Sequence, residues 1–316
     1  MANNNKLASL YGNHRPWTAF LMLLLFVFIG MFVGQFFGFL AMLPLTGVGL
    51  EALSNPNFLA DIMSDPTYKR AVMIMNACVA TSAFIVAPLV YLYGYAKMPL
   101  SIFFNNNNII TIPLLLTIFI VIAFMTVNSI FIEWNAKMEL PEFLRGFEAW
   151  AKRLEEQAEV LTQMMTRFDN KVDLGLALIV IAVVPAVGEE LLFRGLIQNQ
   201  LGGITKNAHV AIWLAAIIFS AFHFQFYGFV PRMLLGALFG YLYYWSGNLL
   251  VPIFAHLMNN GLTLILLYMY QHGAIEFDIE SETSVPFTNI IFSLVLVVAL
   301  IFYFRRYFAV RVKDHG

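Results

Sequence analysis

The chain has 316 residues, of which 60% are apolar and only 12% are charged, and its mean hydropathy is +0.75. Soluble domains carry about 25% charged residues, so this chain has too few polar side chains to coat itself in water, and lipid is expected to supply much of its solvent. A net charge of −1 argues against nucleic acid as a partner. A single cysteine, Cys78, rules out a disulfide within the chain.

Eight apolar runs are long enough to be candidate membrane spans, and they predict an all-α polytopic protein with one membrane-embedded domain over 1–316. In chain order the runs are 17–43, 71–95, 109–132, 174–200, 209–227, 231–246, 249–270 and 286–308. The first run exceeds the apolar core of a secretory signal, which has about 7–15 residues, so we expect it to be retained.

Basic residues predict how the chain is oriented, because Lys and Arg are enriched on the cytoplasmic side of a membrane. They flank both ends of the chain: Lys6, Arg15, Arg305, Arg306, Arg311 and Lys313. Both termini are therefore expected in the cytoplasm, with the protein in the plasma (inner) membrane. The loop 272–285 is acidic and suits the outer side, whereas Lys69 and Arg70 fit this orientation less well.

The segment 134–171 is the longest polar insert, and its charges are of both signs. Phe143, Phe147, Trp150 and Leu154 recur in it at roughly helical spacing. This pattern predicts an amphipathic helix that lies on the membrane or caps the bundle. Such a helix could gate substrate entry or serve only as a structural surface element.

Charged residues interrupt the fourth apolar run, where an unpaired charge would cost several kcal/mol. Glu190 and Arg194 are four residues apart, so they share a helix face and are expected to form a structural ion pair. Glu189 is rotated by about 100° from Glu190 and can face a different cavity. Its unpaired carboxylate is a candidate general base. A purely structural ion network remains the alternative.

The fifth and seventh runs supply further polar groups at helical spacing. Phe219 and His223 are four residues apart, and so are His256 and Asn260. His256 and Asn260 could donate hydrogen bonds to a developing oxyanion, or could simply join helices. Gln225 follows His223 closely and is expected to line the same cavity.

The depth of these groups in the membrane predicts that they meet. With a rise of 1.5 Å per residue, the side chains of Glu189, His223, His256 and Asn260 lie roughly 10–21 Å from the cytoplasmic face. They come from three spans and fall in one layer. We therefore expect a hydrated cavity that opens to the cytoplasm, built by core helices over 174–270.

Together, the three motifs resemble the CPBP family, which groups CAAX prenyl proteases with bacteriocin-processing enzymes and is also called the Abi family. The family pattern is Glu-Glu-x-x-x-Arg, then Phe-x-x-x-His, then His-x-x-x-Asn. Here these motifs read Glu189-Glu190-x-x-x-Arg194, Phe219-x-x-x-His223 and His256-x-x-x-Asn260. Their order and spacing both match over about 188–260.

The resemblance implies an intramembrane endopeptidase whose substrates are membrane-associated peptides or lipidated proteins, CAAX-like or bacteriocin-like. Glu189 would be the catalytic glutamate and His223 its catalytic partner. His256 and Asn260 would stabilise the oxyanion, and the ion pair after Glu189 would hold the fold together, with Phe219 in a supporting role.

Whether a metal takes part is left open. Two histidines and a glutamate are suitable ligands for zinc, and Glu189, His223 and His256 would be the ligand set. No His-Glu-x-x-His motif is present, however, and Glu189 cannot easily serve as both ligand and base. We therefore favour water activated by glutamate without a cofactor.

Two other functions use the same residues. A proton-coupled transporter would employ them as a relay, and such a protein should show an internal repeat, which we do not see. A catalytically silent scaffold or immunity protein would bind a partner in the bilayer. The intact set of motif residues favours the protease.

Overall fold

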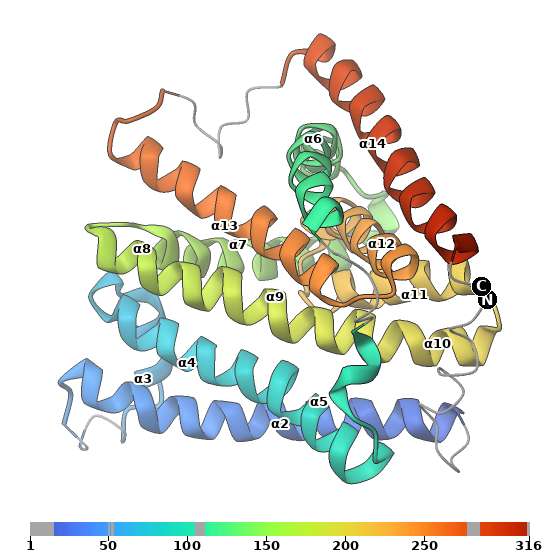
Figure 1. Cartoon of the computed structure of the whole chain (residues 1–316). Helices are drawn as coiled ribbons and strands as arrows, with labels where there is room; N and C mark the ends of the chain where they lie inside the picture. Colours follow the sequence, from blue (N-terminus) through green and yellow to red (C-terminus); the bar gives the residue numbers. More distant parts are fainter. Residues whose placement is uncertain (1–15, 50, 52–53, 105–110, 277–284, 315–316) are drawn as a thin grey trace.

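The computed structural model describes residues 16–49, 51, 54–104, 111–276 and 285–314, and within these ranges every element of secondary structure is a helix (Figure 1). Six helices in the described ranges are long and apolar enough to cross a membrane. They cover Pro16–Thr46, Pro66–Ala96, Thr111–Ala136, Lys171–Thr205, Leu250–Gln271 and Phe287–Val310. The prediction of an all-α polytopic membrane protein is confirmed.

The remaining two predicted spans, 209–227 and 231–246, are not among these six helices. The run at 209–227 becomes α11 (Ala208–Ala221), whose 14 residues cover about 21 Å, less than the roughly 30 Å of a hydrocarbon core. A turn with φ of 54° at Phe224 follows it. The chain then returns as α12 (Phe229–Ser246), which packs along α11. These two helices form a hairpin, so His223 lies in a turn and not within a spanning helix.

One continuous helix of 35 residues runs through the middle of the molecule (Figure 1). Its parts are α8 (Lys171–Ala177), η8 (Leu178–Val183), α9 (Val184–Glu189), η9 (Glu190–Ile197) and α10 (Gln198–Thr205). The segments η8 and η9 are π-helical. Such wide turns occur often at functional sites, and here the second one begins directly after Glu189.

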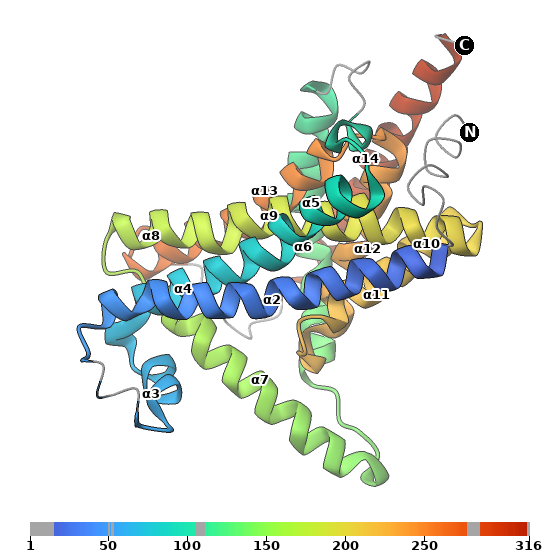
Figure 2. The ribbon, with the colours of Figure 1, turned by 90° about the horizontal axis from the view of Figure 1, so that it is seen from below.

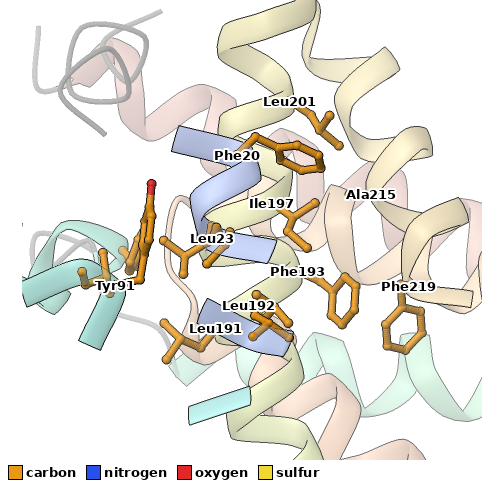
Figure 3. Packing of buried hydrophobic residues seen from close by; sticks show 14 of the residues in the cluster. Phe20, Leu23, Tyr91, Leu191, Leu192, Phe193, Ile197, Leu201, Ala215 and Phe219 are labelled. Atoms are coloured by element: carbon orange, nitrogen blue, oxygen red, sulfur yellow. The ribbon is translucent and has the colours of Figure 1, made fainter. Parts of the chain in front are cut away.

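This central helix is buried because α2 (Pro16–Thr46) and α11 cover its sides. Figure 3 shows the cluster that forms between them, with the rings of Phe193 and Phe219 directed toward each other. The cluster contains Phe20, Leu23, Leu191, Leu192, Phe193, Ile197, Leu201 and Phe219. Burial of these apolar side chains holds the segment that carries the charged motif in place.

The first two spans lie against each other at close range. The second span consists of η3 (Pro66–Tyr68), α4 (Lys69–Thr81), η4 (Ser82–Val86), α5 (Ala87–Val90) and η5 (Tyr91–Ala96). Small residues of α2 allow the approach: a Cβ on Gly34 would come within 2.7 Å of the Val79 Cα, and one on Gly30 within 2.8 Å of the Ser82 carbonyl oxygen. Close backbone contact of this kind drives helix association in lipid.

The other half of the molecule is built on α6 (Thr111–Ala136), α13 (Leu250–Gln271) and α14 (Phe287–Asp314). Figure 2 shows α6 running across α2 rather than along it. Ile120 and Val121 of α6 are buried against Phe239 of α12 and Phe304 of α14. The two halves meet at the central helix, where α13 packs against η8 and α9.

The polar insert contains the expected amphipathic helix. After η6 (Leu100–Phe103) and α6, the short helix η7 (Glu142–Leu144) leads into α7 (Arg145–Thr166). Figure 2 shows α7 extending away from the other helices. Ala151 and Met164 are buried on its inner side, whereas Phe143, just ahead of it, is 84% exposed. Whether the outer apolar side chains lie on the membrane stays a prediction.

The structure explains why Lys69 and Arg70 fit the orientation rule poorly. The ammonium of Lys69 lies 2.9 Å from a carboxylate oxygen of Asp173, and Arg70 lies 2.9 Å from the other oxygen. Both cations are therefore paired with Asp173, Lys69 as a buried side chain and Arg70 as an exposed one, and neither is a free loop charge. Lys6, Arg15 and most of the acidic loop lie outside the described residues.

Candidate active site

A buried ion pair joins the central helix to α12. The Arg194 Nη1 donates to Glu190 Oε1 over 2.8 Å, and Nη2 donates to the Gly236 carbonyl oxygen over 2.9 Å. Both side chains are essentially inaccessible to solvent. The guanidinium carbon lies 4.6 Å from the centre of the Phe219 ring. The expected contact between Glu190 and Arg194 is therefore present, and Phe219 supports it from α11.

The same carboxylate also holds His256. Nδ1 of His256 lies 2.8 Å from Glu190 Oε1, and a carboxylate oxygen can only accept, so Nδ1 carries a proton. His256 is 4% exposed and packs at 5.4 Å, centroid to centroid, over Phe239. Glu190 thus holds two helices in place, one through Arg194 and one through His256.

Glu189 points elsewhere, as its rotation on the helix predicts. It lines a cavity of about 140 Å³ together with Phe84, Phe193, Phe222 and His223. No hydrogen bond occupies its carboxylate within the described part of the chain, and Nε2 of His256 lies 4.0 Å from its Oε2. A carboxylate left open in an apolar, roomy pocket can take a proton from water.

His223 faces Glu189 across that cavity. Its Nδ1 lies 2.9 Å from the Phe219 carbonyl oxygen and so donates to it, which leaves Nε2 as the acceptor in the neutral ring. The ring meets Phe219 edge to face, with centroids 5.1 Å apart. The turn after α11 therefore fixes both the tautomer and the direction of the imidazole.

Asn260 lies next to His256 on α13 but is already hydrogen bonded. Its Nδ2 donates to the Ile181 carbonyl oxygen over 2.9 Å and lies 3.2 Å from Nε2 of His256. Its Oδ1 accepts from Asn259. The structure brings His256 beside Glu189 and Asn260 beside His256, yet neither is among the residues that line the cavity shared by Glu189 and His223. As placed, both amide hydrogens of Asn260 already have acceptors.

Gln225 does not line the cavity as expected. Its Nε2 donates to Glu155 of α7 over 3.3 Å, and its Oε1 accepts from Arg232 of α12 over 2.8 Å. The backbone N–H of Tyr227 donates to the other oxygen of Glu155. The insert helix thus anchors the segment that follows His223, a contact between residues far apart in sequence.

Sequence reasoning missed three features of this site. Phe84 of η4 forms one wall of the cavity, and a Cβ on Gly188 would come within 2.9 Å of the Phe84 Cβ. Gly236 leaves room for the Arg194 guanidinium. Arg232 donates to Gln225 and forms no ion pair with a carboxylate of the described residues. Of these features, only the close approach at Gly188 left a signal in the sequence, namely a glycine directly before the paired glutamates.

The donor set does not fit the zinc alternative. Across the described residues, no group of three His, Cys, Asp or Glu side chains is arranged to hold a metal ion. Nδ1 of His256 is bonded to Glu190, and its Nε2 is bonded to Asn260. Glu189, His223 and His256 therefore do not form a ligand cluster in this arrangement.

Comparison with known proteins points to one family. Residues 171–262 match the family model of the type II CAAX prenyl endopeptidase Rce1-like proteins. The uncharacterized protein YpbD of Bacillus subtilis (strain 168) is 35% identical over 83 residues, which make up 25% of this chain and 39% of that protein. No solved structure matches the chain significantly. All three motifs lie in the matched segment, so the match over 171–262 is consistent with the CPBP resemblance and shows what this part of the chain is similar to.

Proposed function

We propose that this protein is an intramembrane endopeptidase that hydrolyses peptide bonds through water activated by Glu189. The observation that carries the proposal is the cavity of about 140 Å³ that Glu189 shares with His223. The proposed base and its partner come from the central helix and from the turn after α11, and they line a space large enough for water. The family match supports the reaction class.

In the proposed mechanism, Glu189 takes a proton from water, and the resulting hydroxide attacks the scissile carbonyl carbon. Nε2 of His223 accepts a hydrogen bond from the same water and orients it, because Nδ1 is held by the Phe219 carbonyl oxygen. The protonated Glu189 then returns its proton to the leaving amine. General base catalysis of this kind contributes about 10²–10⁴-fold in rate.

We assign the oxyanion to His256 and Asn260. In the substrate-free arrangement these two side chains bond to each other over 3.2 Å. A substrate oxygen that enters between them would accept from Asn260 and from a protonated Nε2 of His256, while Glu190 remains bonded to Nδ1. A donor aimed at developing charge in a dry site contributes about 3–4 kcal/mol.

The proposed substrates are membrane-associated peptides or lipidated proteins, because the site lies among helices that span a bilayer. We place the protein in the plasma membrane, with both termini and the mouth of the cavity on the cytoplasmic side. This orientation rests on the distribution of Lys and Arg at the two ends of the chain.

The test is cleavage of a library of prenylated and unmodified peptides by the purified protein in liposomes. Replacement of Glu189 by Gln should lower kcat by at least about 10²-fold with little change in binding, because the amide cannot accept the proton. Glu156→Gln, on the exposed face of α7, is the matched control and should leave cleavage unchanged.

Metal content is measured on the same preparations, and a strong chelator should not affect the rate. If no peptide is cleaved, or if Glu189→Gln cleaves as fast as the wild type, the protease assignment is wrong. Transport or partner binding would then be the function to test.

A further inference from the structure

Arg232 lies on the first turn of α12, just after the segment that holds His223. Its Nη2 donates to Gln225 Oε1 over 2.8 Å. A Cβ on Gly228 would come within 2.9 Å of that same nitrogen, so the glycine leaves the guanidinium room to pack against the turn. The side chain is held in a defined place and does not extend into bulk solvent.

This guanidinium lacks a counter-ion. Nη1 of Arg232 is inaccessible to solvent and has no hydrogen-bond partner among the described residues, and no described carboxylate lies within 4.0 Å of the group. Arg194 makes the contrast clear, because it is bonded to both Glu190 and Gly236. Leaving a guanidinium N–H shielded from solvent without an acceptor is unfavourable, so this partly buried side chain has room for an anionic partner at Nη1.

The groups around Arg232 connect it to the segment that carries His223. Arg232 is bonded to Gln225, which follows His223 by two residues and is itself bonded to Glu155. The two oxygens of Glu155 are already taken by Gln225 and by the Tyr227 N–H. Glu189 is needed as the base. The guanidinium is therefore tied to the segment that carries His223, one of the residues that line the cavity.

We propose that Arg232 binds a carboxylate of the substrate, and that this contact selects peptides with a negative charge close to the cleaved bond. The proposal rests on the proposed function. Two sources have the required chemistry: the free C-terminus of the peptide, and the side chain of an Asp or Glu. A planar guanidinium suits both, because its N–H groups match the geometry of a carboxylate.

The experiment compares two pairs of labelled peptides. One pair differs only in a C-terminal carboxylate or carboxamide. The other pair has an amidated end and carries Asp or Asn beside the cleaved bond. Cleavage is measured with the wild type, Arg232→Gln and Arg232→Lys, and binding of each peptide is measured in proteins that also carry Glu189→Gln. The matched control is Arg70→Gln, which removes a guanidinium bonded to Asp173 far along the chain.

The wild type and Arg70→Gln should favour the charged member of one pair by about 10- to 100-fold in kcat/KM, mainly through KM, because a hydrogen bond to a charged group has about that effect. Arg232→Gln should remove the preference, and Arg232→Lys should keep part of it. The pair that shows the preference identifies the source of the carboxylate.

Equal treatment of both members by the wild type would overturn the proposal. So would an Arg232→Gln protein that is slowed equally on charged and neutral peptides, since this assigns the residue to the oxyanion or to folding. Absence of all cleavage would instead count against the protease assignment. Binding to the Glu189→Gln proteins then still tests Arg232, and Arg232→Lys replaces the Gln variant if the latter does not fold.

Discussion

At the scale of single residues, two neighbouring glutamates have different surroundings and so different tasks. Glu190 is 0% exposed and is bonded to Arg194 and His256, so its charge is used to join helices. Glu189 faces a cavity and keeps its carboxylate free for chemistry. The difference comes from one step of rotation along the helix, and the wide π-helical turn begins between them.

The structural task of Glu190 predicts that its replacement lowers the stability of the fold. Glu190→Gln should destabilise the fold by about 3–5 kcal/mol, because it leaves the buried Arg194 without a counter-charge. The control is Glu142→Gln, which breaks an exposed pair with Arg145 and should not measurably change stability. Thermal unfolding in one detergent checks both variants. Equal melting temperatures would show that the buried pair is not structural.

At the scale of elements, close helix crossings decide where the cavity lies. Gly188 lets η4 approach α9 so that Phe84 becomes a wall of the cavity beside Glu189. The insert helix α7 acts from the opposite side, because Glu155 anchors the segment after His223. Glu189 and the segment after His223 each contact an element remote from them in sequence.

The crossing predicts that Gly188→Ala disturbs both stability and activity. Its Cβ would meet the Phe84 Cβ at 2.9 Å, and overpacking of this kind costs about 1–3 kcal/mol. Gly175→Ala is the matched control on the same helix, because nothing lies within 4 Å of a Cβ there. It should be neutral or slightly stabilising. Thermal unfolding and peptide cleavage test both variants. An active, stable Gly188→Ala protein would contradict the close contact between Gly188 and Phe84.

At the scale of the whole molecule, the hairpin of α11 and α12 leaves the predicted orientation intact. The six long helices give an even number of crossings. The hairpin adds either no crossing or two crossings, so both termini are expected on the same side of the membrane in either case. The sequence-based count of eight and the six long helices of the structure therefore predict the same topology.

This parity gives a direct test. Epitope tags at the N- and C-termini should be reached by a protease only from the cytoplasmic side of membrane vesicles. A tag in the acidic loop 272–285 should be cut only from the outer side. Termini found on opposite sides would mean an odd number of crossings, and at least one of the long helices would then not span the bilayer.

Much of the architecture could be predicted from residues alone, because it depends on local rules. Long apolar runs specify helices in lipid, and four-residue spacing brings Glu190 to Arg194 and Phe219 to His223. These properties depend on neighbours along one helix. The end of α11 was missed, since a left-handed residue at Phe224 leaves no mark in an apolar run.

The remaining features depend on which helices lie side by side, and hydropathy does not specify that. Phe84 as a cavity wall, Glu155 as an anchor and Arg232 without a counter-ion all arise from contacts across the fold. The bonds that His256 and Asn260 already make are of the same kind. In lipid, close packing and buried hydrogen bonds choose the partners of each helix, and both are properties of pairs of surfaces rather than of one stretch of chain.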